Sequence, residues 1–326
     1  MSSLITAKNI TMTFSIRKGL KKLYFNAVDN ISIDVNEGEV VGLIGESGSG
    51  KTTLGKITLD LLKPTKGEVY FQGKNIRKMN KQEYKKYRIN AQYIPQDPYA
   101  SLNPYKRVVD ILSDIVSYHM PKLTNDQVVD LVSKTMERVG LSPPEKYYEK
   151  YPFQLSGGER QRLSIARAII LNPRYVVADE PVTMLDASLK AGIMSTLANL
   201  IEEMNSSLLF ITHEISLLQF FGEKTRVIIM YLGKFVEEAP LSKIINNAAH
   251  PYTQALIAAI PVPDPKARET RKIILKGPQP SPVNKPPGCV LSNRCPFAMD
   301  ICRKEQPPAA EIDRNHYVYC WLYSKK

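Results

Sequence analysis

Residues 39–52 read Glu-Val-Val-Gly-Leu-Ile-Gly-Glu-Ser-Gly-Ser-Gly-Lys-Thr, and this stretch decides the fold. Its first half is a continuous apolar run, which is typical of a buried parallel strand. Its second half fits the pattern G-x-x-x-x-G-K-[ST], and residues 52–62 are predicted to form the helix that follows. A glycine loop between a buried strand and a helix exposes backbone N–H groups that can wrap phosphates. The stretch predicts a phosphate-binding site, although by itself it does not separate a transporter ATPase from a GTPase or a kinase.

Two side chains at the end of this loop carry the expected chemistry. Lys51 would reach the β- and γ-phosphates of a nucleotide, and the Thr52 hydroxyl would hold Mg²⁺. The residues predicted to contact phosphates or Mg²⁺ are Gly45, Glu46, Ser47, Gly48, Ser49, Gly50, Lys51, Thr52 and Thr53.

The segments on both sides of the loop alternate between strand and helix patterns. Period-two alternation or short apolar runs predict further strands, at residues 4–14, 28–36, 66–73, 175–178, 208–212 and 226–231. Apolar residues at three-to-four spacing predict helices, at residues 107–119, 126–139 and 187–204. The resulting order predicts an α/β fold with a mainly parallel sheet covered by helices, together with an all-helical insert.

Composition divides the chain into three predicted parts. Residues 1–260 would form the nucleotide-binding domain, with a helical subdomain at about residues 97–165. Residues 261–287 contain eight prolines and would form an extended linker. Residues 288–326, which contain all four cysteines, would form a small metal- or cluster-binding extension.

The bulk properties favour an ordinary globular protein, since 43% of the 326 residues are hydrophobic and 23% are charged. The first residues lack the layout of a signal peptide, and no uncharged apolar run has the length of a membrane span. We therefore expect a cytosolic location. The net charge of +12 is scattered along the chain, which favours a lysine-rich surface or a nearby anionic membrane over nucleic-acid binding.

Residues 175–180, Tyr-Val-Val-Ala-Asp-Glu, form a buried strand that ends in two carboxylates. In α/β sheets, ligands bind at the carboxyl ends of the strands. Asp179 would fix Mg²⁺ through a water molecule, and Glu180 would orient or deprotonate the attacking water. Because many buried strands end in acidic residues, this stretch alone does not identify a site.

Residues 155–161, Leu-Ser-Gly-Gly-Glu-Arg-Gln, place a glycine pair before a predicted helix. Such a pair exposes N–H groups at the positive end of the helix, although in isolation it could be a plain helix cap. Three single residues occupy loops beside the predicted elements: Gln96 in Tyr-Ile-Pro-Gln-Asp, Asp186 in Leu-Asp-Ala-Ser, and His213 in Ile-Thr-His-Glu.

Taken in order, these motifs resemble the nucleotide-binding domain of an ABC ATPase, which closes as a head-to-tail dimer on ATP. The fold implied by this resemblance has a parallel-sheet core, an antiparallel β subdomain and a helical insert. The resemblance implies that Gln96 joins Mg²⁺ and the attacking water to the helical insert, that His213 contacts the γ-phosphate, and that Asp186 lies at the dimer interface. The residues that would bind the ATP of the opposite subunit are Ser156, Gly157 and Gly158. The implied catalytic residues are Glu180, His213, Gln96 and Lys51.

One position departs from the family pattern, and the assignment of another is open. Met184 stands where the family usually has a small residue, which makes the packing of the Asp186 loop less certain. The aromatic side chain that stacks on adenine is expected to be Phe14, while Tyr24 and Phe25 remain alternatives because a basic insertion at Ser15–Leu23 precedes them.

Several segments resemble the oligopeptide/dipeptide (Opp/Dpp) importer ATPases, and the insertion before Ala27 is similar to the OppF/DppF type. These segments are residues 96–104, 250–256, 260–264, 281–284, 288–289 and 294–296. The resemblance implies a second ATPase subunit, two membrane permease subunits, an external solute-binding protein and a peripheral position on the cytoplasmic face of the membrane, without nucleic acid.

The cysteines Cys289, Cys295, Cys302 and Cys320 have the spacing C-x5-C-x6-C-x17-C. Disulfides are unusual in the cytosol, and zinc modules usually bring close C-x2-4-C pairs, which are absent here. In the Opp/Dpp family the pattern resembles a [4Fe-4S] site, for which four thiolates are the usual ligands. Zinc, disulfides and free thiols remain alternatives.

An ATPase subunit does not contact the transported solute, so its sequence does not identify that solute. Oligopeptides are the first hypothesis and oligosaccharides the second. A different class, the soluble ABC ATPases of ribosome recycling or DNA repair, usually has two ATP domains, coiled coils or large inserts, none of which the sequence predicts. A regulatory nucleotide binder without hydrolysis is disfavoured because Lys51, Glu180 and His213 are all present.

Overall fold

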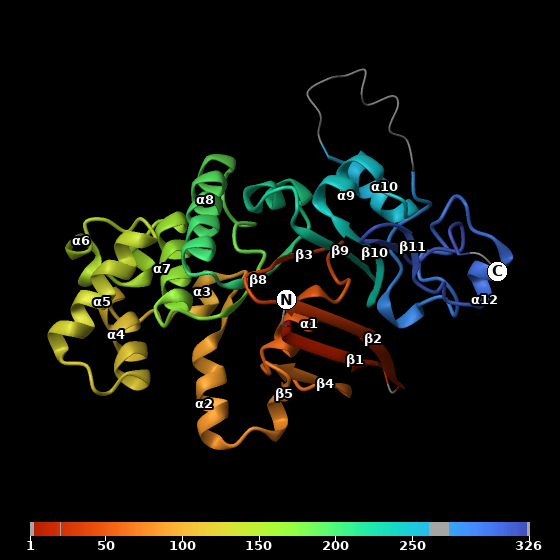
Figure 1. Cartoon of the computed structure of the whole chain (residues 1–326). Helices are drawn as coiled ribbons and strands as arrows, with labels where there is room; N and C mark the ends of the chain where they lie inside the picture. The colour runs from red at the N-terminus through yellow and green to blue at the C-terminus, as the bar shows by residue number, and fades with distance from the viewer. Residues whose placement is uncertain (1–2, 20, 261–273, 325–326) are drawn as a thin grey trace. The chain divides into compact units, whose positions relative to one another are not determined.

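The computed structural model describes residues 3–19, 21–260 and 274–324 (Figure 1). The contacts divide the chain into two compact units. Unit 1 comprises residues 1–6, 34–40 and 69–211, and unit 2 comprises residues 7–33, 41–68 and 212–326. The first part of the predicted linker, residues 261–273, lies outside the described residues. The predicted division near residues 260 and 288 stays a prediction.

Unit 2 contains the strand that leads into the glycine loop. This strand, β3 (Val40–Ile44), pairs in parallel with β9 (Arg226–Tyr231). From β9 onward the pairing is antiparallel, through β10 (Lys234–Pro240) and β12 (His316–Val318) to β11 (Ala310–Asp313). The last strands of the chain thus continue the same ladder as β9.

The helices of unit 2 are mostly short. They are α1 (Lys51–Thr58), α9 (Leu241–Asn247), α10 (Pro251–Ala258) and α12 (Asp300–Lys304). The prediction that the first helix reaches residue 62 was wrong. Asp60 has a φ of 52°, and the N–H of Leu61 bonds to the Lys56 carbonyl, so the backbone leaves the α-helical path after Thr58.

The central strands of unit 1 form the parallel ladder that the sequence predicts. The ladder comprises β6 (Ala91–Ile94), β7 (Tyr175–Asp179) and β8 (Ser207–Thr212), with β7 in the middle. Every residue of β7 and β8 is buried, as expected for strands covered on both faces. The helix α8 (Ala187–Glu203) connects these two strands and ends within a residue of its predicted boundary.

The predicted helical insert is also present in unit 1. It contains α3 (Pro98–Ser101), α4 (Val108–His119), α5 (Asn125–Arg138), α6 (Glu145–Tyr148) and α7 (Gly157–Ile169). In Figure 1, α4, α5, α6 and α7 gather into one helical cluster, and α4 contacts the other three. A further helix, α2 (Lys81–Asn90), precedes β6 and was not predicted.

Two long neighbouring strands, β1 (Ser3–Lys18) and β2 (Lys21–Asn36), begin the chain. They run on through most of the predicted insertion Ser15–Leu23, because Ile16 and Tyr24 favour extended backbone even where the side chains are exposed. The strands β4 (Lys66–Phe71) and β5 (Lys74–Asn75) pair antiparallel. Within the described residues, no helix combines the length and the apolar character that crossing a bilayer requires.

Candidate nucleotide-binding site

The glycine loop of unit 2 has the tight backbone that its sequence predicts. Gly50 has a φ of 106°, and a Cβ on this residue would lie 2.2 Å from the Ala27 carbonyl oxygen. A Cβ on Gly45 would lie 2.1 Å from the Met230 carbonyl oxygen. Only glycine fits at these two positions, because any side chain would collide with backbone.

Lys51 is buried at the start of α1 and folds back across the loop. Its Nζ donates to the carbonyl of Gly45 at 2.7 Å and to that of Glu46 at 3.0 Å. These two carbonyl oxygens satisfy part of the hydrogen-bonding capacity of the buried Lys51 ammonium group. The hydroxyl of Ser49 is buried and has no hydrogen-bond partner among the described residues. A ligand or water in the loop would satisfy such a group.

The acidic end of β7 lies in unit 1. Asp179 is almost fully buried, and the Tyr93 hydroxyl donates to its carboxylate at 2.8 Å. Burial raises the pKa of Tyr93, and the Asp179 carboxylate raises it further, so the phenol stays protonated and remains the donor. The carboxylate of Asp179 is therefore held in a fixed direction at the end of the strand.

The next residue, Glu180, is held in an unusual backbone conformation. Its φ is 45°, the left-handed region, which is costly for a residue other than glycine. Its N–H bonds to the carbonyl of Ile211 in β8 at 2.9 Å. Its carboxylate accepts from Gln96 Nε2 and from the Thr183 hydroxyl, each at 3.1 Å. Two of the predicted catalytic residues, Gln96 and Glu180, are thus in direct contact.

The segment after Gln96 connects to the glycine pair. Asp97 caps α3 by accepting from the N–H of Tyr99 at 2.7 Å. The guanidinium of Arg160, in α7, lies over the Tyr99 ring at 3.6 Å. Because α7 begins with the glycine pair, the Gln96 segment is in contact with the helix whose first turn carries Gly157 and Gly158.

Ser156 forms a capping box at the start of α7. Its hydroxyl accepts from the N–H of Glu159 at 3.3 Å, and the Glu159 carboxylate accepts from the N–H of Ser156 at 2.8 Å. A Cβ on Gly157 would find its nearest neighbour at 3.6 Å, and one on Gly158 at 3.5 Å. Neither residue is forced to be glycine by contacts within the described chain.

The other predicted site residues have local partners. Asp186 caps α8 by accepting from the N–H groups of Ser188 and Leu189, at 3.1 and 3.0 Å, and the Ser188 hydroxyl lowers the Asp186 pKa. His213 follows β8, is exposed, and has its Nε2 at 3.8 Å from the Glu214 carboxylate. Phe14 packs against Phe25 with ring centroids 6.0 Å apart, so the adenine-stacking residue stays a prediction. Met184 is exposed.

Three of the four cysteines are buried, and Cys295 is partly buried. Burial raises the pKa of Cys289 to about 12 and that of Cys320 to about 11. The other three thiols contribute to the shift in the Cys289 pKa, and those of Cys295 and Cys302 contribute to the shift in the Cys320 pKa. Burial also raises the pKa of Cys295. The four thiols therefore lie within electrostatic reach of one another. Among the described residues, no group of three or more His, Cys, Asp or Glu side chains is arranged to hold a metal ion.

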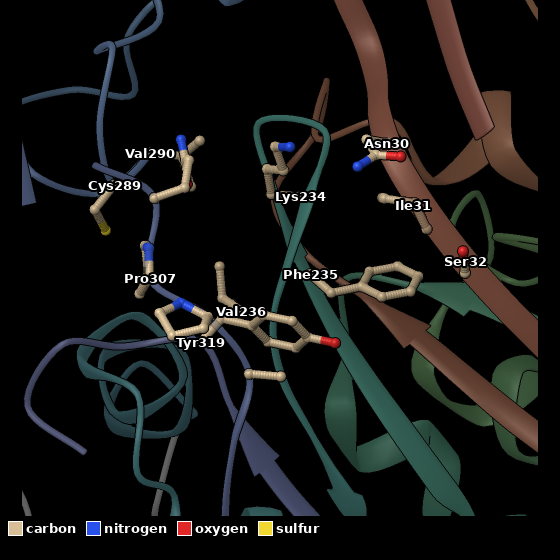
Figure 2. Close-up of a pocket in the computed structure, with 13 residues that line it drawn as sticks. Asn30, Ile31, Ser32, Lys234, Phe235, Val236, Cys289, Val290, Pro307 and Tyr319 are labelled. Carbon is tan, nitrogen blue, oxygen red and sulfur yellow. The ribbon is translucent and has the colours of Figure 1, made fainter. Parts of the chain in front are cut away.

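A cavity of about 330 Å³ lies beside Cys289 in unit 2 (Figure 2). Phe235, Val236 and Tyr319 line it together with Cys289, and Lys234 stands at its side. None of its lining residues belongs to the glycine loop. This cavity is therefore not the predicted phosphate site.

Several residues that hold the predicted site were missed in the sequence. Tyr93 precedes Gln96 by three residues and Thr183 follows Glu180 by three, and such close neighbours could have been examined as partners. The phenol of Tyr252 accepts from the N–H of Glu46 at 2.8 Å, and Arg294 bonds to the Glu46 carboxylate at 3.1 Å. Both come from segments quoted for the importer resemblance, but nothing in the sequence indicated their partner.

Comparison with known proteins gives a consistent picture. The ABC transporter family matches residues 28–183, and the family described as oligopeptide/dipeptide transporter, C-terminal region, matches residues 236–302. The oligopeptide transport ATP-binding protein AppF of Bacillus subtilis is 39% identical, with 99% of this chain and 98% of AppF covered. The protein of the same description from Haemophilus influenzae, OppF, is 37% identical, with 97% and 96% covered.

Solved structures agree with the fold. The ATP-binding cassette MJ0796, a dimer in a post-hydrolysis state bound to ADP and Pi, is 30% identical and has a TM-score of 0.63 over 73% of this chain and 98% of that chain. The predicted ABC ATPase fold is confirmed. Similarity along nearly the whole chain to transport proteins favours a transporter subunit over the soluble ABC ATPases. The names of both relatives refer to oligopeptide transport and not to sugar transport. The chain belongs to the family of ABC-transporter ATP-binding subunits that includes the oligopeptide transport proteins AppF and OppF.

Proposed function

We propose that this chain is the ATP-hydrolysing subunit of an importer for oligopeptides. The observation that carries the proposal is the position of Glu180, whose carboxylate is held by Gln96 and Thr183 directly after the buried Asp179. A carboxylate held in this way next to a second one suits a base that orients or deprotonates water. The peptide part of the proposal is supported by the names of the relatives and by the C-terminal family match.

Each motif has a role in this proposal. The glycine loop would bind the phosphates of ATP, and Lys51 would contact the β- and γ-phosphates. The Thr52 hydroxyl would hold Mg²⁺, and Asp179 would fix the ion through a water molecule. Hydroxyl and carboxylate oxygens are ligands that suit this ion. Glu180 would activate the attacking water, Gln96 would join Mg²⁺ and that water to the helical insert, and His213 would contact the γ-phosphate. Mg²⁺ supplies charge neutralisation at the phosphates when it is bound.

The glycine pair of α7 acts on the ATP of another subunit. Neither Gly157 nor Gly158 is required by packing within the described chain, which supports a role toward a ligand from outside. The N–H groups at the start of α7 and the cap residue Ser156 would face that ATP. The partner would be a second ATPase subunit of the OppD/DppD type, with Asp186 at the shared interface.

The importer would also contain two membrane permease subunits and an external solute-binding protein, with this chain on the cytoplasmic face of the membrane. The helical cluster of α3 to α7 offers the surface that would receive a membrane subunit, because α3 follows Gln96 directly. Contact at this cluster would reach the Gln96–Glu180 pair through α3.

We further propose that Cys289, Cys295, Cys302 and Cys320 hold a [4Fe-4S] cluster. Four partly or fully buried cysteines of one segment supply the four-thiolate donor set of such a cluster. Zinc is the alternative, and the close C-x2-4-C pairs that zinc modules usually bring are absent from this spacing. The cluster would have a structural role.

Metal analysis of anaerobically purified protein tests this assignment. About four iron and four sulfide per chain are expected, with the content lowered in the Cys302→Ser variant. Stoichiometric zinc without iron would assign the site to zinc, and protein that folds normally with neither would show free thiols. Both of these results would contradict the cluster.

The importer itself is tested by reconstitution of the complete transporter in vesicles. ATP hydrolysis is measured with the solute-binding protein loaded with short peptides and, in parallel, with oligosaccharides. Stimulation by the peptide-loaded form alone is expected. Stimulation by the oligosaccharide-loaded form alone would overturn the peptide assignment, and the absence of ATP hydrolysis in every sample would overturn the ATPase.

A further inference from the structure

The glycine loop is held from outside by the C-terminal segment of unit 2. An Nη atom of Arg294 lies 3.1 Å from one carboxylate oxygen of Glu46 and 3.4 Å from the other. Glu46 is the second residue of the loop, and 248 positions separate the two residues. The Arg294 side chain is only 12% exposed. An ion pair that is mostly shielded from water is held more firmly than the usual surface pair.

Arg294 is itself fixed at several points. Its Nε donates to the Gly277 carbonyl at 3.2 Å, and its guanidinium donates to the Tyr231 hydroxyl at 3.3 Å. Its carbonyl accepts from the N–H of Lys276 at 2.9 Å. With its amide nitrogen turned toward the loop, Gln279 also donates to Glu46, at 3.0 Å. The guanidinium is therefore placed before any ligand arrives.

A second attachment fixes the backbone of the same loop residue. The phenol of Tyr252 accepts from the N–H of Glu46 at 2.8 Å, and the Tyr252 ring packs on Tyr231 with centroids 4.6 Å apart. Tyr252 is fully buried in the first turn of α10, and its own N–H bonds to His250 Nδ1 at 3.1 Å. The side chain and the backbone of Glu46 are thus both held by residues that lie far away in the sequence.

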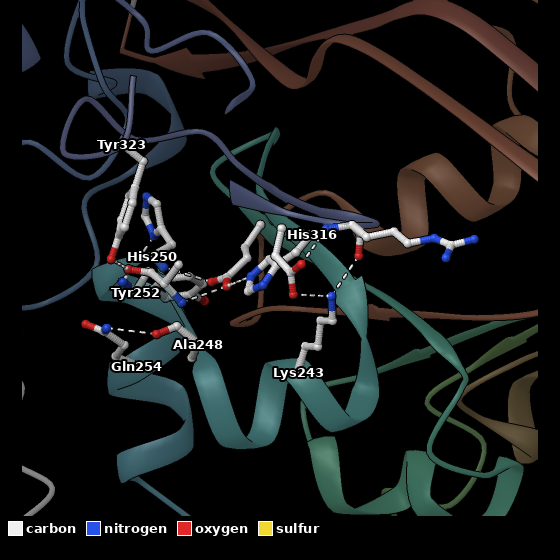
Figure 3. A network of polar contacts seen from close by, with 11 residues as sticks. Lys243, Ala248, His250, Tyr252, Gln254, His316 and Tyr323 are labelled. Atoms are coloured by element: carbon white, nitrogen blue, oxygen red, sulfur yellow. Dashed lines mark hydrogen bonds and ion pairs between the residues drawn. The ribbon is translucent and has the colours of Figure 1, made fainter. Parts of the chain in front are cut away.

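His250 belongs to a buried polar network (Figure 3). The carboxylate of Glu237 in β10 accepts from the N–H groups of Ala249 and His250, at 2.7 and 2.9 Å, and contacts His316 Nε2 in β12 at 2.7 Å. These contacts connect the last strand of the chain to the start of α10. The network supports Tyr252, whereas the ion pair to Glu46 comes from Arg294.

The negative charge of Glu46 gives a reason for an arginine beside the glycine loop. A loop that binds phosphates gains from N–H groups and cations, and a carboxylate in the same loop repels the anion. A guanidinium at 3.1 Å offsets that negative charge and also keeps the carboxylate turned toward itself. Offsetting the Glu46 charge lowers repulsion only when an anion occupies the loop. The Arg294–Glu46 pair is therefore expected to affect the affinity for nucleotide more than the free energy of folding.

We propose that Arg294 is a positioning residue for nucleotide binding, which holds Glu46 and neutralises its charge beside the phosphates. The proposal rests on the function proposed above, in which ATP binds the glycine loop. In this role Arg294 acts through Glu46 and takes no part in activating the attacking water. Its removal is therefore expected to raise the KM for ATP with little change in kcat, because the loss affects binding rather than the activation of water.

The experiment measures ATP hydrolysis by the complete transporter carrying Arg294→Met. We expect the KM for ATP to rise roughly tenfold, since a charged hydrogen bond is lost and a carboxylate is left uncompensated. In a Glu46→Gln background, the same substitution is expected to change KM less than about twofold, because the charge to be offset is gone. The matched control is Arg303→Met, an exposed arginine of the same segment, which should leave KM unchanged.

Arg294→Lys keeps the charge and provides a milder variant in case Arg294→Met fails to fold. It should retain a KM close to that of the wild type, and circular dichroism and the melting temperature verify folding for each variant. A folded Arg294→Met complex with unchanged KM would overturn the proposal, as would an equal KM effect in the Glu46→Gln background. If the wild-type complex binds no ATP, the proposed function fails instead, and the two failures are thereby distinguished.

Discussion

At the scale of single residues, the most informative side chain is Glu180. Its left-handed φ of 45° costs stability, and the bonds to Gln96, Thr183 and the Ile211 carbonyl hold it there. Strain that neighbouring groups maintain is common at functional sites. In this conformation the backbone departs from the extended geometry of β7, and the Glu180 carboxylate contacts Gln96.

Replacing Glu180 by glutamine tests its role. The amide keeps the size and most hydrogen bonds of the carboxylate but is not a base, so kcat should fall by about 10²- to 10⁴-fold while ATP binding persists. Steady-state hydrolysis and equilibrium binding of ATP measure the two quantities. Glu202→Gln, at an exposed position of α8, is the control and should behave as the wild type. Unchanged turnover in Glu180→Gln would show that another group activates the water.

At the scale of elements, the long buried strands and amphipathic helices followed from their patterns. The strand β9 begins and ends where predicted, and α4 and α5 differ from prediction by one residue at their ends. The helix α2 was missed because its sequence, Lys-Gln-Glu-Tyr-Lys-Lys-Tyr-Arg-Ile-Asn, carries many charges and no clear apolar stripe. Its capping box, formed by Asn80 and Glu83, was a local signal that could have revealed it.

The site residues that the sequence predicted belong to short motifs, in which the local spacing itself carries the chemistry. Arg294 and Tyr252 could not be predicted in the same way, because a contact across hundreds of residues depends on strand order and register. Neither strand order nor register follows from local periodicity. The support of the glycine loop became visible only in the folded structure.

The proposed role of the glycine pair in α7 is tested by the variant Gly157→Ala. Gly157→Ala meets no close contact and should leave the melting temperature unchanged or slightly higher, since alanine favours helix. Hydrolysis by the assembled transporter should nevertheless fall at least about tenfold, because the added methyl stands where the partner's ATP would approach. The control is Gly192→Ala, an exposed position inside α8, which should gain about 0.5–1 kcal/mol of stability without a change in activity. Full activity in Gly157→Ala would contradict the role toward a partner.

At the scale of the whole molecule, the last fifty residues share strand pairing and side-chain contacts with the rest of unit 2. Residues from this part supply two strands to the ladder of β9 and β10, and one of them, His316, contacts the buried Glu237. Arg294 lies next to Cys295, and both N–H groups bond to the Leu291 carbonyl in one turn. The cysteine segment and the support of the glycine loop therefore share the same backbone.

The buried network around His250 gives the molecule a predictable response to acid. Burial lowers the pKa of His250 from 6.5 to about 4, and the Glu237 carboxylate opposes this shift only in part. Between these two values the unfolded chain binds a proton that the folded chain excludes, so stability is complete above about pH 6.5 and is lost as the pH falls toward 4. The loss attributable to His250 is on the order of 3 kcal/mol.

Urea midpoints at pH 7 and pH 5 measure this response, and the His250→Asn variant isolates its source. Asparagine can accept the N–H of Tyr252 as the cap of α10 but does not titrate, so the difference between the two midpoints should shrink. His213→Gln, at an exposed histidine, should keep the wild-type difference. If His250→Asn remains folded and retains the full pH dependence, the acid sensitivity arises from another group. The burial of a neutral His250 at the start of α10 would then not be the cause of the loss of stability in acid.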